Sequence, residues 1–481
     1  MIKDIYGKYK KLSLEVKASL WFMICSVVQK GISFITVPIF TRIMTTNEYG
    51  EYSVFLSWES ILAIFVTLNL SYQVFNNGMV KYKEDKDGYT TSMVGLTFIV
   101  ATISFTFYVL FHNFFNSYID VKTDYMFLMF LDMIFTAVNG LWIVRKRYDF
   151  KYRELTLITL INVFLNPILG VIFVTTFSNK VLARIISIVL SNLLVFLLLF
   201  GSLLKKSKEL FKLKYWKYAL KIDLPLIPHY LSLVLLNNSD RIMINKFCGM
   251  SYTAFYSVAY NVSMIMQIII TSINASFNPW LYQQLEKKDY KDIRKNTNLL
   301  LIVVACSSLI PAIFAPEVLS ILGSKEYAEA VTIIPPLTCC VFITFVYTLF
   351  SNVELFYEKS NYIMIGSLSA TIINLILNFV FIQIFGYEAA AYTTLTCYLL
   401  LALFHYIMMK KTCIEKNLKE QIFDIKFIIF LIIFVILFSF CIMMIYNFFL
   451  LRYLIITLLF LIVITKRKKI YIILKSVNDC K

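Results

Sequence analysis

Apolar stretches of about twenty residues follow one another along almost the whole chain. A helix of about 20 apolar residues is long enough to cross the hydrocarbon core of a membrane. Of the 481 residues, 59% are hydrophobic, which exceeds the usual share in soluble domains. The sequence therefore predicts an all-α integral membrane protein with about fourteen transmembrane helices. These helices are predicted at residues 18–40, 52–75, 90–112, 125–144, 156–177, 183–204, 222–245, 254–280, 298–316, 330–356, 362–383, 388–409, 427–446 and 450–465.

Short motifs recur in two halves of the chain. The matching pairs are Arg42-Ile43-Met44 with Arg241-Ile242-Met243, Tyr52-Ser53-Val54 with Tyr256-Ser257-Val258, and Ile161-Asn162-x-x-x-Asn166 with Ile373-Asn374-x-x-x-Asn378. Each copy contains an even number of predicted spans, so the repeat is parallel and its axis runs along the membrane normal. We therefore predict two pseudo-symmetric six-helix lobes around a central cavity, followed by two extra C-terminal helices.

These predictions divide the chain into four segments. The N-lobe covers residues 1–204, a basic connector covers 205–221, and the C-lobe covers 222–409. Residues 410–481 hold the two additional helices and a basic tail.

The net charge of +17 is distributed unevenly. Most of the 46 Lys and Arg residues lie in the N-terminus, the even-numbered connections and the C-terminus, with the richest cluster in the connector. This asymmetry follows the positive-inside rule and predicts that both termini are cytoplasmic. The basic charge is therefore a topology signal with some attraction to anionic lipids, and it does not indicate nucleic-acid binding.

Motifs for metal, nucleotide or covalent chemistry are missing from the sequence. The nine cysteines include no C-x-x-C pair, and the chain has no G-x-x-x-x-G-K-[ST], H-E-x-x-H or G-x-S-x-G motif. The sequence thus predicts no cofactor, no metal site and no enzymatic activity. A membrane polysaccharide polymerase or ligase, the alternative from another class, would need a large outer loop with catalytic residues, and none is predicted here.

Proline and polar residues mark three predicted spans. Pro225 and Pro228 interrupt the start of the seventh span, and Pro38 lies in the first. In the eighth span, a polar stripe at steps of three or four residues contains Tyr260, Ser263, Gln267, Thr271, Asn274 and Asn278. Such a stripe must face protein or water, so it lines a water-filled cavity or forms hydrogen bonds between helices. The second span has a shorter polar face with Glu59, Asn69, Gln73 and Asn76.

Several segments resemble a known family when they are considered in order. They are residues 40–53 (FTRIMTTNEYGEYS), Asp240-Arg241, residues 254–260 (AFYSVAY), Asn278-Pro279-Trp280 with Asp289-Tyr290, residues 373–378 (INLILN) and residues 385–391 (FGYEAAA). Together they resemble Wzx-type polysaccharide flippases of the multidrug/oligosaccharidyl-lipid/polysaccharide (MOP) superfamily. The resemblance covers about residues 15–409.

The resemblance implies a flippase of the bacterial cytoplasmic membrane. Its substrate would be an undecaprenyl-diphosphate-linked oligosaccharide, moved to the outer leaflet by alternating access for O-antigen (lipopolysaccharide) or capsule synthesis. Its other partners would be membrane lipids, a coupling proton or sodium ion, and polysaccharide polymerase machinery. Fourteen spans also occur among lipid II flippases, and a cation-coupled drug antiporter of the same superfamily is a further alternative.

Five cations are candidates for contact with the diphosphate or sugar. Lys30 lies near the middle of the first span, where a charge is costly unless it has a role. Pairing with Glu59 or Asp132, or snorkelling, is the alternative for Lys30. Arg42 and Arg241 end the first and seventh spans, and Arg145 and Arg147 end the fourth. For these arginines, helix anchoring or topology is the alternative explanation.

Three carboxylates are candidates for ion coupling, namely Glu59, Asp132 and Asp240. Each is predicted at membrane depth, where burial favours exchange of a proton. Pairing with Lys30 or Arg241 is the alternative. His229 and Glu354 are weaker candidates for the same role.

Overall fold

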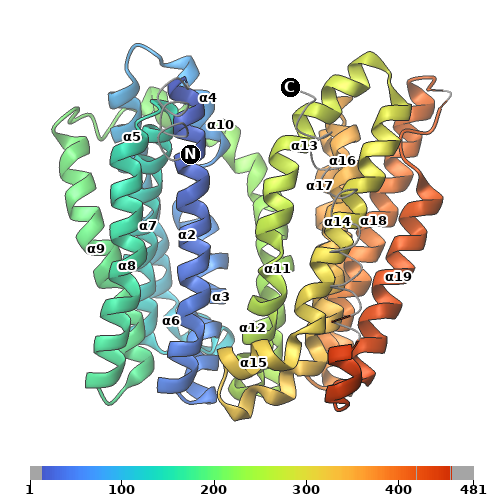
Figure 1. Ribbon diagram of the computed structural model, residues 1–481. Coiled ribbons are helices and arrows are strands. Elements are labelled where there is room, and N and C mark those ends of the chain that lie inside the picture. The colour runs from blue at the N-terminus through green and yellow to red at the C-terminus, as the bar shows by residue number, and fades with distance from the viewer. Residues whose placement is uncertain (1–12, 419, 455–456, 458–481) are drawn as a thin grey trace, which may run out of the picture. The chain divides into compact units, whose positions relative to one another are not determined.

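The computed structural model of the chain describes residues 13–418, 420–454 and 457. In these residues all regular elements are helices, and no strand occurs (Figure 1). The chain divides into two compact units, one that ends at Asn245 and one that begins at Lys246. The predicted all-α membrane architecture is confirmed. The division between units lies 24 residues after the end of the predicted connector at residue 221, inside a helix.

Twelve helices in the described residues are long and apolar enough to cross a membrane. They correspond to the first predicted span and to the third through thirteenth. The second predicted span corresponds to α3 (Thr46–Thr67), which carries Glu48, Glu51 and Glu59 and is not among the twelve. The fourteenth predicted span, 450–465, lies mostly outside the described residues. The chain is thus a multi-pass membrane protein.

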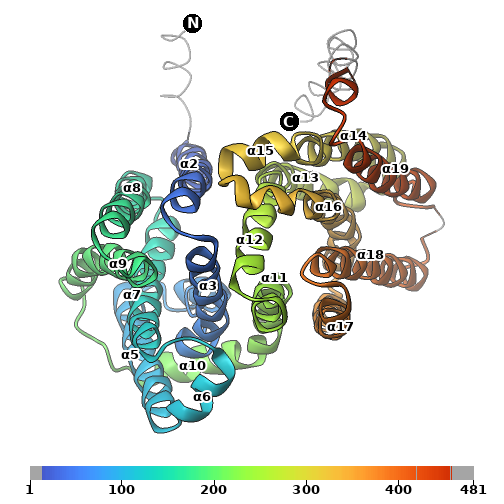
Figure 2. The ribbon, with the colours of Figure 1, turned by 90° about the horizontal axis from the view of Figure 1, so that it is seen from below.

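Helix α7 is the central helix of unit 1. It packs against α3, α5, α8 and α9, and these neighbours surround it in Figure 2. Unit 1 contains α2 (Leu14–Ile43), α3, α4 (Gln73–Lys81), α5 (Lys86–Leu110), α6 (His112–Ile119), α7 (Thr123–Tyr148), α8 (Tyr152–Thr176), α9 (Lys180–Leu204), α10 (Leu213–Asp223), the 3₁₀ helix η1 (Leu224–Leu226) and most of α11 (Ile227–Cys248). Helix α2 lies against α8 at the edge of this group.

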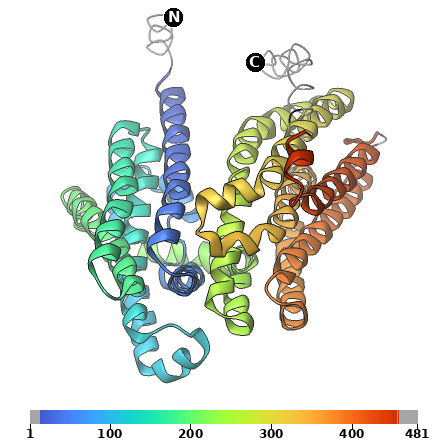
Figure 3. The ribbon, with the colours of Figure 1, turned by 60° about the horizontal axis from the view of Figure 1, so that its bottom comes forward.

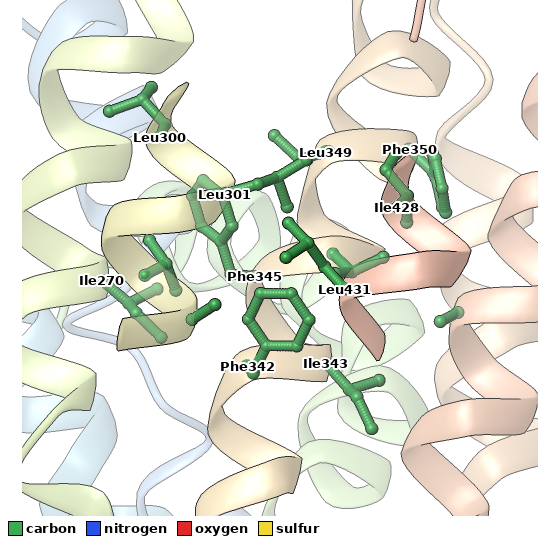
Figure 4. Close-up of a cluster of buried hydrophobic side chains, with 14 of the residues drawn as sticks. Ile270, Leu300, Leu301, Phe342, Ile343, Phe345, Leu349, Phe350, Ile428 and Leu431 are labelled. Atoms are coloured by element: carbon green, nitrogen blue, oxygen red, sulfur yellow. The ribbon is translucent and has the colours of Figure 1, made fainter. Parts of the chain in front are cut away.

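Helix α16 has the same central position in unit 2. It packs against α12, α14, α17, α18 and α19. Figure 3 shows the helices of this unit, coloured from yellow-green to red, beside one another. Unit 2 contains α12 (Met250–Met264), α13 (Gln267–Lys287), α14 (Tyr290–Ile313), α15 (Ala315–Leu322), the 3₁₀ helix η2 (Lys325–Ile333), α16 (Ile334–Phe356), α17 (Ser360–Phe385), α18 (Ala389–Glu415) and α19 (Ile425–Met444). Figure 4 shows the core around α16, where Phe342, Phe345 and Leu349 lie between α14 and α19.

The repeat predicted from sequence appears in the pairing of helices. Helix α7 packs against α3, α5, α8 and α9, and α16 packs in the same way against α12, α14, α17 and α18. In both units the first two of these helices also contact each other, and so do the last two. The repeated arginines also make equivalent bonds. Arg42 Nη1 donates to the Pro38 carbonyl and Arg241 Nη1 donates to the Asn237 carbonyl, each over 2.9 Å. The two-lobe prediction is therefore confirmed, lobe by lobe.

Local sequence explains where these helices begin and bend. Thr45 and Glu48 form a capping box at the start of α3. The predicted interruption of the seventh span is found at η1, which contains Pro225 and separates α10 from α11. Helix α2 continues through Pro38 without a break. The eighth span is divided at residues 265–266, so it consists of two helices instead of the single one expected.

The basic connector is packed against unit 1. Trp216 Nε1 donates to the Ser92 carbonyl over 2.8 Å, and Asp85 accepts hydrogen bonds from Lys212 at 2.8 Å and Tyr215 at 2.6 Å. A Cβ atom placed on Gly95 would lie 1.9 Å from the Leu210 carbonyl oxygen, so the backbone at residue 210 needs glycine at this position. Burial raises the pKa of Asp85, but the hydrogen bonds to its carboxylate outweigh burial and lower the pKa below its ordinary 3.8.

Candidate functional site

A network of polar side chains lies inside unit 1 where α7, α8 and α9 meet. Asp132 is 4% exposed, and its Oδ1 accepts a hydrogen bond from Asn192 Nδ2 at 2.9 Å. Asn192 Oδ1 accepts from Asn162 Nδ2 at 3.2 Å, and Asn162 Oδ1 accepts from Ser191 Oγ at 2.8 Å. Each member is therefore held by its neighbours in a defined orientation. The repeated Asn162 thus joins α8 to α9.

The matching asparagines of unit 2 have a comparable role. Asn374 Nδ2 donates to Thr394 Oγ1 at 3.3 Å, and Asn378 accepts a hydrogen bond from Thr393. These bonds join α17 to α18, as the bond between Asn162 and Ser191 joins α8 to α9. The repeated asparagines are therefore ties between equivalent helices.

Glu59 of α3 lies close to Asp132 of α7, where these two helices pack against each other. A hydrogen bond between two carboxyl groups would require a proton on one of them, because two carboxylates can only accept. Two like charges in contact inside a protein are also strongly unfavourable. One proton or one cation on the pair would remove this repulsion.

Arg184 supplies a single positive charge to the same region. It is 7% exposed, and its guanidinium lies 4.3 Å from the centre of the Phe40 ring and 5.3 Å from that of Tyr52. It donates to Asn166 Oδ1 at 2.9 Å, and no ion pair joins it to a carboxylate in the part of the chain that the structure describes. This region therefore holds one buried positive charge, on Arg184, and two carboxyl groups, on Glu59 and Asp132. Its charges balance when one of the two carboxyl groups carries a proton.

Sequence reasoning did not select Arg184. A signal was available, since Arg184 is a charge within a predicted span, as Lys30 is. Its position at the start of that span does not reveal its burial, which follows from the packing of Phe40 of α2 and Tyr52 of α3 over its guanidinium.

Arg145 and Arg147 have different environments although they are two residues apart. Arg145 is 7% exposed and forms ion pairs with Asp87, at 3.0 Å, and with Asp149. Arg147 is exposed, and its guanidinium lies 5.7 Å from the centre of the Phe22 ring. Arg145 thus ties helix ends together, while Arg147 is available to a ligand.

Arg147 lines a cavity of about 860 Å³ within unit 1. Its lining residues are Ser71, Tyr72, Gln73, Asn76, Gly140, Ile143, Val144, Arg147 and Tyr148. The cavity forms because α3 ends at Thr67, the next two residues, Leu68 and Asn69, adopt the left-handed conformation, and α4 begins at Gln73 beside α7. Its volume lies within the range of about 300–1,000 Å³ typical of ligand sites. One cation, two amides and three hydroxyls thus share a cavity that no carboxylate lines.

The remaining predicted cations lie apart from this cavity. Lys30 is exposed on α2, and no ion pair joins it to Glu59 or Asp132 in the described residues. Arg42 is exposed at the end of α2, and Arg241 is partly buried in α11. Asp240 beside it is 1% exposed.

The predicted polar stripe of the eighth span is distributed over two helices. Ser263, on α12, is fully buried and donates to the Ala259 carbonyl, so it does not line a cavity. On α13, Asn278 Oδ1 accepts from Asn352 Nδ2 at 2.9 Å, and Asn274 Oδ1 is buried without a hydrogen-bond partner in the described residues. Gln267 is partly buried and Thr271 is exposed.

The fold is shared with solved membrane transporters. A multidrug resistance MATE family transporter of the MOP superfamily, in an inward-facing conformation, is 14% identical and has a TM-score of 0.65 over 82% of this chain and 96% of its own. The lipid II flippase MurJ, in an inward closed conformation, is also 14% identical and has a TM-score of 0.69 over 94% of this chain and 100% of its own. The two helical units thus define a membrane protein of the MOP superfamily fold.

The family within this class follows from sequence comparison. The polysaccharide biosynthesis protein family matches residues 16–285, more than half of the chain, and the MatE family matches residues 225–380. The chain therefore belongs to the polysaccharide biosynthesis protein family. An uncharacterized membrane protein of Haemophilus influenzae is 21% identical over 375 residues, which cover 75% of this chain and 88% of the relative.

Proposed function

We propose that this protein flips an undecaprenyl-diphosphate-linked oligosaccharide repeat unit from the cytoplasmic to the outer leaflet of the bacterial cytoplasmic membrane. The observation that carries the proposal is the match to the polysaccharide biosynthesis family across residues 16–285. The cavity beside Arg147 lies within the same residues. The transport would proceed by alternating access for synthesis of a surface polysaccharide such as O-antigen or capsule. Polysaccharide polymerase machinery would then use the flipped product.

The chemistry of the cavity supports a ligand with both charge and hydroxyl groups. A guanidinium can donate two parallel hydrogen bonds to a phosphate, and Arg147 would take this role. The amides of Gln73 and Asn76 can each donate and accept, as sugar hydroxyls require. The rings of Tyr72 and Tyr148 provide apolar surface for sugar faces. Lys30, Arg42 and Arg241 are proposed as further contacts along the path of the diphosphate.

The carboxyl pair of Glu59 and Asp132 is proposed as the coupling site. Binding of a proton or a sodium ion would neutralise the second carboxyl beside Arg184, and release would restore the charge. Because the pair joins α3 to α7 and the network continues to α9, ion occupancy can change how these helices pack. Asp240, which is buried on α11, is a further candidate for coupling. Polar residues of α13, Gln267, Thr271, Asn274 and Asn278, are proposed to line the transport path.

Cells that lack this protein provide the test. Wild type should clear lipid-linked oligosaccharide that accumulates on the cytoplasmic side, and Arg147→Ala should fail to clear it at equal expression. Arg153→Ala is the matched control, because Arg153 is also exposed and lies outside the cavity lining. Equal rescue by Arg147→Ala would remove this cavity from the mechanism. Accumulation of lipid II would indicate a lipid II flippase, and altered sensitivity to cationic drugs alone would indicate an antiporter.

A further inference from the structure

Glu354 of α16 and His405 of α18 form a buried pair in the interior of unit 2. His405 Nδ1 lies 3.1 Å from Glu354 Oε1 and 3.0 Å from Oε2. Glu354 is 0% exposed and His405 is 2% exposed. The pair joins two helices that pack along each other beside α17 (Figure 2). Both groups can exchange protons, and both are removed from water.

Aromatic and backbone groups enclose the pair. The Tyr347 ring stacks on the imidazole with 5.8 Å between ring centres, and the Phe404 ring meets it edge-on at 5.4 Å. From α17, a Cβ atom on Gly366 would lie 3.0 Å from His405 Nε2, so this helix lies close to the other side of the imidazole. Tyr347 is the titratable group that faces the pair from α16.

Other charges on the surrounding helices lie elsewhere. Helix α17 contains no Asp, Glu, Lys, Arg or His, and the nearest charges along α18 are Lys410, Lys411 and Glu415. Glu415 is paired with Lys359 at 2.7 Å, and Lys411 lies over the Tyr362 ring. Helices α12, α13, α14 and α19 and the 3₁₀ helix η2 also pack against α16, and no ion pair joins their side chains to Glu354 or His405 in the described residues. His405 is thus the titratable partner of Glu354 among the described residues.

The net charge of the pair depends on the number of protons it holds. When Glu354 is a carboxylate and the imidazole is neutral, the pair has a net negative charge. One added proton makes the pair neutral, and a second makes it positive. A charge without a partner is costly inside a low-dielectric interior, so the state with one added proton is favoured there. That proton is shared between Nδ1 and a carboxylate oxygen, and its loss or gain titrates the pair as a unit.

We propose that Glu354 and His405 form a proton-binding site of unit 2 that is loaded and unloaded during transport. The site is separate from Glu59 and Asp132 of unit 1, and the proposal rests on the proposed flippase function. In both units an acid on the central helix bonds to the same partner helix of the repeat. Asp132 joins α7 to α9, and Glu354 joins α16 to α18. Proton release from this site would leave a buried carboxylate charge and favour a rearrangement of α16 against α18.

A first experiment measures proton exchange without transport. The full-length protein with ¹⁵N-labelled histidine would be placed in lipid nanodiscs and followed by NMR between about pH 5 and 8, the range in which histidine commonly titrates. The His405 signal is identified by its absence in His405→Asn, because the chain has three histidines. We expect this signal to titrate and its titration to change in Glu354→Gln. A His405 signal that is constant across the range would overturn the proposal.

A second experiment links the site to transport in proteoliposomes. A one-unit pH gradient corresponds to a tenfold ratio of proton activity, so each coupled proton should bias the steady-state leaflet distribution of lipid-linked oligosaccharide by about tenfold. Glu354→Gln should lower this bias by about tenfold, while Tyr347→Phe, which keeps the ring, should retain it. An equal bias in Glu354→Gln and wild type would overturn the proposal.

Two controls separate the failures that could occur. If wild type does not flip the lipid, the proposed function fails, while the histidine titration still decides whether the site binds protons. If the single variants do not fold, Glu354→Gln combined with His405→Asn keeps a hydrogen bond between α16 and α18 and removes both titratable groups. This double variant should flip the lipid down its own gradient and lose the response to the pH gradient.

Discussion

Arg145 and Arg147 allow a structural role and a functional role to be separated within one turn of α7. The Arg145 side chain is 8% exposed, and its carboxylate partners Asp87 and Asp149 are 40% and 20% exposed. Loss of one partner from a fully buried ion pair costs about 3–5 kcal/mol. Because both carboxylates retain contact with water, we reduce this to about 2 kcal/mol for Arg145→Met. Arg147→Met removes an exposed side chain and should change stability by less than about 0.5 kcal/mol.

Thermal unfolding of the purified variants measures this difference. For a unit of this size, about 1 kcal/mol corresponds to about 2–4 °C, so Arg145→Met should lower the unfolding midpoint by about 4–8 °C. Arg147→Met should unfold within about 2 °C of wild type and should lose lipid flipping. All scans would use one detergent and one heating rate, because unfolding of membrane proteins is commonly irreversible. An unchanged midpoint for Arg145→Met, or a larger loss for Arg147→Met, would refute the division of roles.

Three further predictions concern unit 1. Asp223 is fully buried, and neither carboxylate oxygen has a hydrogen-bond partner in the described residues. Because a buried charge without a partner is unfavourable, Asp223→Asn should raise the unfolding midpoint by about 2–4 °C, and a lower midpoint would contradict this. Asn192→Leu leaves Asp132 without its 2.9 Å donor and should destabilise the protein by about 1–3 kcal/mol, whereas an unchanged midpoint would show that the network is not formed. The lowered pKa of Asp85 means that its ion pair with Lys212 stabilises the fold above about pH 4, the ordinary value, and is lost as pH falls through the lowered value. The difference in unfolding midpoint between wild type and Asp85→Asn should therefore be full at neutral pH and disappear in acid, and a difference that persists in acid would contradict the assignment.

Much of the architecture could be predicted because bilayer thickness and hydrophobic composition constrain helices strongly. The apolar stretches located the helices, the paired motifs revealed the repeat, and Pro225 marked the break before α11. The break within the eighth span was not predictable in this way. Residues 265–266, where α12 ends and α13 begins, contain neither glycine nor proline. Their sequence therefore gives no local signal for the break.

The candidate site was predicted less completely, because partners far apart in sequence decide which charges are available. Sequence placed Glu59 and Asp132 at membrane depth, and the structure brings them together. It could not distinguish the paired Arg145 from the exposed Arg147, since both end the same helix. Lys30 was a candidate because it lies near the middle of a predicted span, but its side chain is exposed in the structure. Arg184 and His405 were missed because burial by neighbouring helices, and not their own position, makes them unusual.

Direct transfer of a lipid-linked oligosaccharide across a membrane tests the central proposal most closely. The purified protein would be reconstituted into vesicles that contain undecaprenyl-diphosphate-linked oligosaccharide in both leaflets. An impermeant enzyme or lectin would then report the fraction accessible from outside. Wild type should make nearly all of the lipid accessible, whereas Arg147→Ala should leave about half protected, as in protein-free vesicles. Equal protection in vesicles with wild type and in protein-free vesicles would contradict the proposed flippase function.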